Sequence, residues 1–196
     1  MGYNPKDFYF KKAKEQNFAA RSVFKLEEID QRFKLFQKGY KILDLGCAPG
    51  SWTQYASQKI GTNGFCIGID LQKVALALPN TEFVQGDAFD EPTVAELSAK
   101  HSITQFDIVM SDMAPKTTGI RIQDQQRSFD LCVRALDVAK QRLRLGGHFI
   151  VKMFQSEFFD EYLKQVKPCF LKTELLRPKS TRKSSYEIYI VGIKKS

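Results

Sequence analysis

The sequence predicts an α/β fold with a seven-stranded, mostly parallel sheet and helices on both faces. Apolar strand-like runs alternate with amphipathic segments along most of the chain, which indicates parallel strands joined by helical crossovers. The turn between the last two runs, 170–176 and 187–193, is too short for a crossover, so the last strand should be antiparallel. The length of 196 residues fits one domain over 21–196, with a basic N-terminal arm or helix over 1–20 packed on it.

The first half of the chain is expected to supply three strands. Val23, Leu26 and Phe33 recur at near-helical spacing, and Gly61 follows a later apolar helix as a C-terminal cap. The elements expected here are helix 21–33, strand 41–45, helix 51–60, strand 65–70, a short helical piece before Pro79, and strand 82–85.

The second half is expected to supply the other four strands. Pro92 suits the first turn of a helix that opens at Asp90, and Gly146-Gly147 should end a long helix. In order, we expect the helix from Asp90, strand 106–112, a helix over about 123–145, strand 148–154, a helix near 158–166, and strands 170–176 and 187–193.

The turn after strand 41–45 has the composition of a ligand site. Asp44 lies within the apolar strand, where a carboxylate is costly unless it finds donors. Glycines follow at once and a helix begins at Ser51, an arrangement that lets a ligand approach the backbone. Asp70 ends the next strand 20 residues after Gly50, the spacing of an acid that binds a ribose. A third glycine for a pyrophosphate is missing, which disfavours a dinucleotide; the alternative is an ordinary strand-to-helix turn.

Further charged residues follow or interrupt other strands. Asp70, Asp87 and Asp112 come at strand ends, where ligands bind in sheets of this kind. Several acids on adjoining strands suggest a polar ligand with several donors. Lys152 interrupts the apolar run 149–154, and a buried lysine needs an anionic partner or a lowered pKa. The alternative is a lysine at the end of a strand that reaches water.

The charge distribution is compatible with an RNA partner. The net charge is +8, which suits a polyanion, although it also serves solubility. Lys11, Lys12 and Lys14 stand among aromatic residues that are able to stack on bases. The alternative is a solvated helix whose aromatic side chains pack on the domain.

Other classes of protein are disfavoured by composition. Four cysteines are scattered without C-x-x-C pairs, which indicates reduced thiols in a reducing compartment. His101 and His148 are far apart in the sequence, so we expect no metal site. No apolar run approaches the roughly 18 residues of a membrane span, and the N-terminus lacks the apolar segment of a secretory signal. We therefore expect a cytoplasmic protein, or a mitochondrial one from a eukaryotic source.

Several motifs together resemble one family. The pattern D-x-G-x-x-P-G-x-W over 44–52 resembles motif I of S-adenosylmethionine (SAM) methyltransferases, in the variant typical of the FtsJ RNA 2′-O-methyltransferases. Segments 24–29, 111–119, 151–152 and 185–189 resemble successive FtsJ motifs, in the family's order and over almost the whole chain. The resemblance implies a Rossmann-like fold, SAM as cofactor, and methyl transfer to a ribose 2′-oxygen of RNA.

The resemblance also implies roles for individual residues. Lys25, Asp112, Lys152 and Glu187 match the family's Lys-Asp-Lys-Glu tetrad, with Lys152 as the proton acceptor. The residues expected to bind SAM are Asp44, Gly46, Pro49, Gly50, Trp52, Asp70, Leu71, Asp87, Ala88 and Asp112. The residues expected to bind RNA are Lys11, Lys12, Lys14, Arg21, Lys179, Arg182 and Lys183. One arginine of the family's R-[SA]-R segment is replaced by Ala19, and the lysines at 11–14 are candidates to compensate.

The short chain resembles the family members that act on a uridine of large-subunit ribosomal RNA. We expect a monomer that acts within an assembling large subunit. One alternative is a transfer-RNA or messenger-cap methyltransferase, although such relatives usually carry additional sequence. Another is a non-catalytic RNA-binding module, which decay of the tetrad would mark. A base-directed enzyme usually carries [DN]-P-P-[YF], whereas this chain has Asp112-Met-Ala-Pro115.

Overall fold

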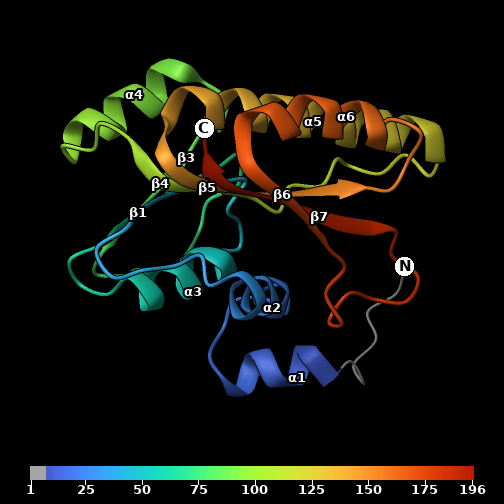
Figure 1. The fold of residues 1–196 in the computed structure, drawn as a ribbon. Helices are drawn as coiled ribbons and strands as arrows, with labels where there is room; N and C mark the ends of the chain where they lie inside the picture. The colour runs from blue at the N-terminus through green and yellow to red at the C-terminus, as the bar shows by residue number, and fades with distance from the viewer. Residues whose placement is uncertain (1–7) are drawn as a thin grey trace.

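A seven-stranded sheet in the order β3-β2-β1-β4-β5-β7-β6 forms the centre of the molecule (Figure 1). The computed structural model describes residues 8–196, so the first seven residues of the predicted N-terminal arm lie outside the described part. The strands are β1 Lys41–Leu45, β2 Phe65–Asp70, β3 Thr81–Gln85, β4 Phe106–Ser111, β5 Leu143–Phe154, β6 Phe170–Leu176 and β7 Glu187–Lys195. β7 runs antiparallel to both of its neighbours, while β1 to β5 pair in parallel. The predicted fold class is confirmed.

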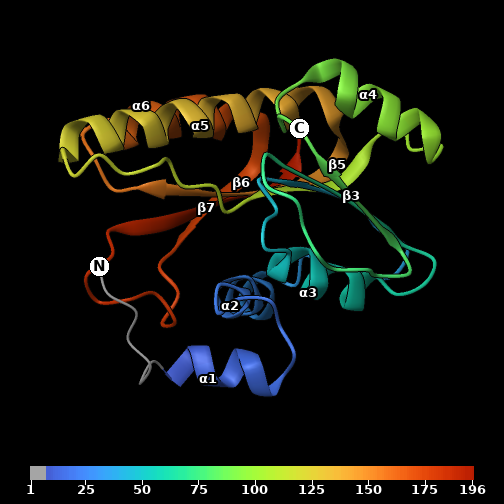
Figure 2. The same ribbon diagram turned by 180° about the vertical axis from the view of Figure 1, so that it is seen from behind.

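Helices cover both faces of the sheet, as Figures 1 and 2 show from opposite sides. The helices are α1 Phe8–Glu15, α2 Val23–Phe33, α3 Ser51–Ile60, α4 Glu91–Lys100, α5 Arg121–Arg142 and α6 Phe159–Val166, with a 3₁₀ turn at Lys167–Cys169. Helices α4, α5 and α6 lie over one face, and α2 and α3 lie over the other, with α1 outside α2. This two-sided cover explains why the central strands are apolar at successive positions.

Each face of the sheet buries its own hydrophobic core. Leu43 of β1 points into the core beneath α4, α5 and α6, while its neighbour Ile42 points into the core beneath α2 and α3. Alternate residues of a strand face opposite sides, so one strand supplies both cores. Tyr9 of α1 contacts Phe24 of α2 with ring centroids 5.5 Å apart, which links α1 to the second core.

The segment after β2 differs from the prediction of a short helical piece. Residues 71–80 form a bend, irregular chain and a turn instead. The Gln72 amide donates to Asp70 Oδ1 at 2.8 Å, and this local bond turns the chain as it leaves the strand. Val74 and Leu76 pack beside the Gly50 turn. The prediction was therefore wrong, because local hydrogen bonding and tertiary packing outweighed helix propensity.

The boundary between α5 and β5 also lies elsewhere than predicted. The helix ends at Arg142, and the strand begins at once with Leu143, whose side chain is fully buried and which pairs with Phe106. Gly146 and Gly147 lie inside β5, where Gly146 has φ +75° and the pairing with β4 shifts register. The glycines thus mark an irregularity in a long strand and do not end the helix.

The strand order predicts where a ligand binds along the edge of the sheet. β1 lies between β2 and β4, so the chain moves outward from β1 in both directions, and such switch points open a crevice at the carboxyl ends of the strands. In residues 8–196, no helix is both long enough and apolar enough to cross a membrane. Within the same residues, no group of three or more His, Cys, Asp or Glu side chains could hold a metal ion.

Candidate active site

A buried carboxylate lies at the start of the crevice. Asp44 is 1% exposed, and its Oδ2 accepts a hydrogen bond of 2.6 Å from Thr53 Oγ1 of α3. Burial raises the pKa of Asp44 to about 7, although the Thr53 hydrogen bond opposes the shift. A carboxylate held at this cost suits a cationic ligand group, because such a group would offset the buried negative charge.

Two glycines shape the turn that follows Asp44. Gly46 has φ +72°, and a Cβ atom at this position would lie 2.0 Å from Met113 Cγ. Gly50 has φ +105°, and a Cβ atom there would lie 2.6 Å from Leu76 Cδ1. Both positions therefore need glycine for conformation and for space.

Asp70 joins the glycine turn to the end of β2. Its Oδ2 accepts from the Ala48 amide at 2.9 Å, and its Oδ1 accepts from the Gln72 amide at 2.8 Å. Each carboxylate oxygen has a second lone pair, so Asp70 is still able to accept hydrogen bonds from ribose hydroxyls. The residue thus has both a structural role and a capacity for ligand binding.

An acid-lined cavity of about 1030 Å³ extends over the ends of β1 to β4. Its walls include six predicted SAM-binding residues, namely Gly46, Asp70, Leu71, Asp87, Ala88 and Asp112. Asp44 and Trp52 line a small hollow beside it, together with Gly46 and Asp112. Pro49 and Gly50 shape the turn without lining either space. The volume of this cavity, and its carboxylates that are able to accept hydrogen bonds, fit a cofactor that carries a ribose, an amine and a cationic sulfur.

The predicted tetrad forms two ion pairs. Lys152 Nζ lies 2.9 Å from Asp112 Oδ1 and also donates to the Asp112 backbone carbonyl, while Lys25 pairs with Glu187. The Lys152 side chain is only 6% exposed, which excludes the alternative of a strand-end lysine extended into water. The sheet explains the assembly, because Asp112 directly follows β4, Lys152 lies in β5, and Glu187 begins β7. Lys25 reaches the site from α2.

A second pocket, of about 380 Å³, lies beside the Lys25–Glu187 pair. Its wall includes Arg21 and Arg182, both predicted to bind RNA, and the rings of Phe154 and Tyr186. We call this space the basic pocket; it is lined by Arg21, Ser22, Lys25, Phe154, Arg182, Ser184, Ser185, Tyr186 and Glu187. It differs in charge from the acid-lined cavity, although the tetrad borders both spaces.

The other residues predicted to bind RNA are more dispersed. Lys12 and Lys179 line a groove of about 680 Å³ between α1, α2 and the β6–β7 loop. Lys11, Lys14 and Lys183 are exposed and line neither the groove nor the basic pocket. The residues predicted to bind RNA therefore lie in a pocket, in a groove and at separate surface positions.

Comparison with known proteins identifies the family. A model of the FtsJ-like methyltransferases matches residues 18–195. The chain belongs to this family. It is a SAM-dependent methyltransferase, as the motifs predicted.

Similar proteins include curated relatives that match this FtsJ-like methyltransferase over its full length. It is 53% identical over 196 residues to the ribosomal RNA large subunit methyltransferase E of Bdellovibrio bacteriovorus, covering 100% of both chains. It is 48% identical over 190 residues to the protein of the same name from Desulfatibacillum aliphaticivorans, covering 95% of this chain and 89% of the relative.

Solved structures share the fold of this FtsJ-like methyltransferase. A Plasmodium falciparum protein, provisionally described as a ribosomal RNA methyltransferase, is 28% identical with a TM-score of 0.81, covering 91% of this chain and 98% of its own. Aeropyrum pernix fibrillarin with bound SAM has a TM-score of 0.54 at 18% identity, covering 80% of this chain and 67% of its own. The second likeness concerns the fold alone.

One residue of the FtsJ-like site was missed from the sequence. The Tyr189 hydroxyl donates to Asp112 Oδ1 at 2.7 Å, and its ring centroid lies 5.8 Å from Lys25 Nζ. Tyr189 is fully buried, and burial raises its pKa well above the ordinary value. The ring therefore lies between the two ion pairs. Strand alternation contained a signal, because Glu187 and Tyr189 are two residues apart and share one face of β7.

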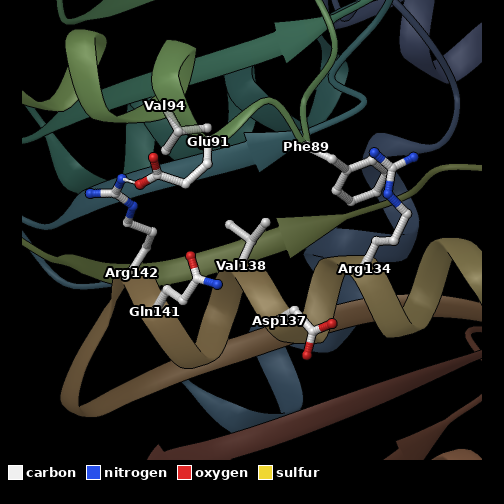
Figure 3. A pocket seen from close by; sticks show the side chains of 8 residues that line it. All are labelled: Phe89, Glu91, Val94, Arg134, Asp137, Val138, Gln141 and Arg142. Carbon is white, nitrogen blue, oxygen red and sulfur yellow. Dashed lines mark hydrogen bonds and ion pairs between the residues drawn. The ribbon is translucent and has the colours of Figure 1, made fainter.

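A further cavity of this FtsJ-like methyltransferase lies between α4 and α5 (Figure 3). Arg134 lies over the Phe89 ring, 4.0 Å from its centroid, and reaches Asp87 of the acid-lined cavity at 3.3 Å. Glu91 and Arg142 form an ion pair at the other end (Figure 3). Arg134 and Phe89 line both this space and the acid-lined cavity, so the two spaces are neighbours.

Proposed function

We propose that this enzyme transfers a methyl group from SAM to the 2′-oxygen of a uridine ribose in large-subunit ribosomal RNA. The observation that carries the proposal is the Lys152–Asp112 ion pair, 2.9 Å long, whose Asp112 lines the acid-lined cavity, while the other ion pair of the tetrad, Lys25–Glu187, lines the basic pocket. The full-length likeness to ribosomal RNA large subunit methyltransferases E supports the choice of RNA.

The charges that line the two spaces favour a different substrate in each of them. Asp70, Asp87 and Asp112 face the cavity proposed for the cationic cofactor, and they outnumber the two cationic residues that line it, Lys116 and Arg134. Arg21 and Arg182 face the pocket proposed for the phosphate-bearing substrate. Opposite charges on the two sides favour one orientation of the two substrates, and orientation is a large part of catalysis for a bimolecular transfer.

The tetrad residues take separate roles in the proposed reaction. When bound, SAM supplies a methyl group on a cationic sulfur and leaves as the neutral thioether S-adenosylhomocysteine. Lys152, in its neutral form, accepts the 2′-hydroxyl proton at Nζ while the ribose oxygen forms its bond to the methyl carbon. Asp112 fixes Nζ through Oδ1 and through its backbone carbonyl. Lys25, held by Glu187, stabilises the negative charge that develops on the ribose oxygen.

The cellular setting belongs to the same proposal. We propose a monomer that acts in the cytoplasm on RNA within an assembling large subunit. Cys47, Cys66 and Cys132 are buried free thiols, as suits a reducing compartment. A domain of this size offers little surface for reading sequence, so the shape of an assembled particle would have to supply part of the specificity.

The test uses large subunits from a strain that lacks the gene. The purified enzyme and labelled SAM are added to these subunits, to deproteinised large-subunit RNA, to transfer RNA and to capped messenger RNA. We expect one 2′-O-methyluridine in the subunits and little label elsewhere, as mapped by nuclease digestion and mass spectrometry. Preferential labelling of transfer RNA or the cap would replace the proposed substrate, and label on a base would contradict the proposed acceptor atom.

A further inference from the structure

We infer that the basic pocket binds the base of the acceptor nucleotide after that base has left its stack, with Tyr186 as the stacking ring. The inference rests on the proposed function and assigns the part of the RNA that lies beside the 2′-oxygen. Base-stacking on an aromatic side chain is a general way to hold an unstacked nucleotide. The pocket offers that ring, a fixed wall, a suitable charge and the right place in the sheet.

The wall of the pocket is held by hydrogen bonds to its backbone. Residues 177–186 connect β6 to β7, and the Glu28 carboxylate of α2 accepts from the amides of Lys179 at 2.6 Å and Ser180 at 2.9 Å. Arg21 donates to the Ser180 carbonyl, and Arg177 donates to the Ser185 carbonyl at 2.6 Å. The helix that supplies Lys25 thus also holds the loop, so the pocket is preformed and loses little entropy on binding.

Two aromatic rings line the pocket. Phe154 and Tyr186 have centroids 4.9 Å apart with an interplanar angle of 63°, and the Gln155 amide donates to the Tyr186 carbonyl at 2.8 Å. The Arg121 guanidinium lies over the Tyr186 ring, 5.8 Å from its centroid. The tyrosine is therefore fixed from its backbone and by two side-chain neighbours. A fixed ring is a better stacking surface than a mobile one, because less freedom is lost when the base arrives.

The register of the sheet places the Phe154 and Tyr186 rings about one nucleoside away from Lys152, the proposed proton acceptor. Phe154 and Lys152 are two residues apart in β5, and they pair with Glu187 and Tyr189 of β7. Two residues of a strand span about 6.6 Å and share one face. A base beside Phe154 and Tyr186 therefore has its ribose directed toward Lys25 and Lys152, about one nucleoside away.

Volume and charge also match a nucleotide. The pocket volume of about 380 Å³ falls within the usual range of small-molecule sites. Arg21, Lys25 and Arg182 line it against one acid, Glu187, which already pairs with Lys25. The excess positive charge suits the phosphates that flank the base.

The direct test is photo-crosslinking. Large subunits from the deletion strain, with uridines partly replaced by 4-thiouridine, are irradiated with the wild-type enzyme and S-adenosylhomocysteine. We expect the nucleotide that the enzyme methylates to be linked to a peptide containing Tyr186 or Phe154. Linkage of that nucleotide only to other peptides would overturn the inference. So would crosslinks at neighbouring uridines without any at the target.

Kinetics of Tyr186 variants give an independent test. Tyr186→Leu keeps apolar bulk but removes the aromatic face, so kcat/KM for the subunits should fall by about tenfold to hundredfold. Tyr186→Phe keeps the face and should stay within about twofold of wild type. The dissociation constant for SAM should be unchanged in both. The control is Leu171→Ala, because Leu171 is 73% exposed on the edge strand β6 and lines none of the pockets described.

Salt dependence separates stacking from phosphate binding. Tyr186→Leu should leave the slope of log affinity against log salt unchanged, because no phosphate contact is lost. A leucine variant with wild-type kcat/KM would overturn the inference while leaving the proposed function intact. Failure of the wild-type enzyme to methylate large subunits would instead refute the proposed function.

Discussion

Tyr189 and Lys152 bind the same atom. The tyrosine hydroxyl donates to Asp112 Oδ1 at 2.7 Å, and Lys152 Nζ lies 2.9 Å from that oxygen. The two residues are also cross-strand partners in the antiparallel pairing of β5 with β7. One carboxylate oxygen is thus fixed from two strands, which restricts where the lysine nitrogen lies relative to the acceptor ribose.

Lys152→Ala should abolish most of the turnover without removing the cofactor site. Lys152 is proposed to face the acceptor ribose and does not line the acid-lined cavity, so SAM affinity should stay nearly unchanged while the single-turnover rate falls by roughly 10²–10⁴-fold. Lys152→Arg should not restore the rate, because a guanidinium stays protonated at any working pH. The measurement is single-turnover methylation of large subunits against pH. A near-wild-type rate for the arginine variant would show that Lys152 is not the base.

Tyr189→Phe should slow turnover while preserving the fold. The variant removes only the hydroxyl that donates to Asp112, so the rate should fall by about five- to tenfold. Tyr162→Phe is the matched control, because Tyr162 is equally buried and donates a hydrogen bond of 2.8 Å to the Cys132 carbonyl. Both variants should lose similar thermal stability, and only Tyr189→Phe should lose rate. Equal rates in the two variants would contradict a positioning role for Tyr189.

Asp44→Asn should stabilise the cofactor-free protein at high pH. Burial raises the native pKa of Asp44 to about 7 from an ordinary 3.8, so the native state holds a proton that the unfolded chain has lost. Stability contributed by this residue therefore falls as pH rises from about 4 to 7, by up to about 4 kcal/mol. Urea unfolding should show the variant to be more stable than wild type at pH 8 and similar at pH 4. Calorimetry with SAM, in the presence of EDTA, should show weaker binding to the variant.

His148→Asn should improve stability in acid. Burial lowers the native pKa of His148 to about 4 from an ordinary 6.5, so below pH 6.5 the unfolded chain binds a proton that the native state excludes. Stability should fall as pH drops from 6.5 to 4, by up to about 3 kcal/mol in wild type. Asparagine retains an acceptor for the Lys194 amide, which lies 3.2 Å from His148 Nδ1. Identical pH dependence of unfolding in the two proteins would refute this account.

Arg182→Gln and Lys183→Gln form a matched pair for RNA binding. Both residues are exposed neighbours in the β6–β7 loop, but only Arg182 lines the basic pocket. Arg182→Gln should reduce the slope of log affinity against log salt by about 1, and Lys183→Gln should reduce it less. Filter binding of large subunits over a series of salt concentrations measures both. The reverse order would place the RNA outside the pocket.

Local patterns in the sequence were sufficient for most elements, whereas the complete tetrad was predicted only from the resemblance to the FtsJ family. Apolar runs and their flanking glycines set the central strands, and Asp70, Asp112 and Lys152 stand out because charged groups are rare at such positions. The position of β7 between β5 and β6 is different, because it depends on pairing between residues far apart in the chain. Tyr189 was missed for the same reason. Its partner Asp112 becomes visible only when that pairing is known.

Two predictions made from the sequence were wrong because of packing: a helical piece in 71–80 and the end of the long helix. The segment 71–80 was given a helical piece, but its apolar residues Val74 and Leu76 pack on the Gly50 turn. The glycine pair at 146–147 resembled a helix end, but Leu143 is fully buried as a strand residue before it. In both cases tertiary packing contributed to the local conformation, and propensity alone contains no information about such contacts.

The interior position of β7 has a consequence for how the enzyme loses activity under stress. Backbone amides of a central strand exchange with solvent only through the largest openings of a protein, whereas an edge strand such as β6 frays more readily. Glu187 and Tyr189 both lie on the interior strand. Mild heating should therefore speed deuterium uptake in β6 well before it does so in β7. Tyr189, which is paired on both sides, should keep its place until the sheet opens around it.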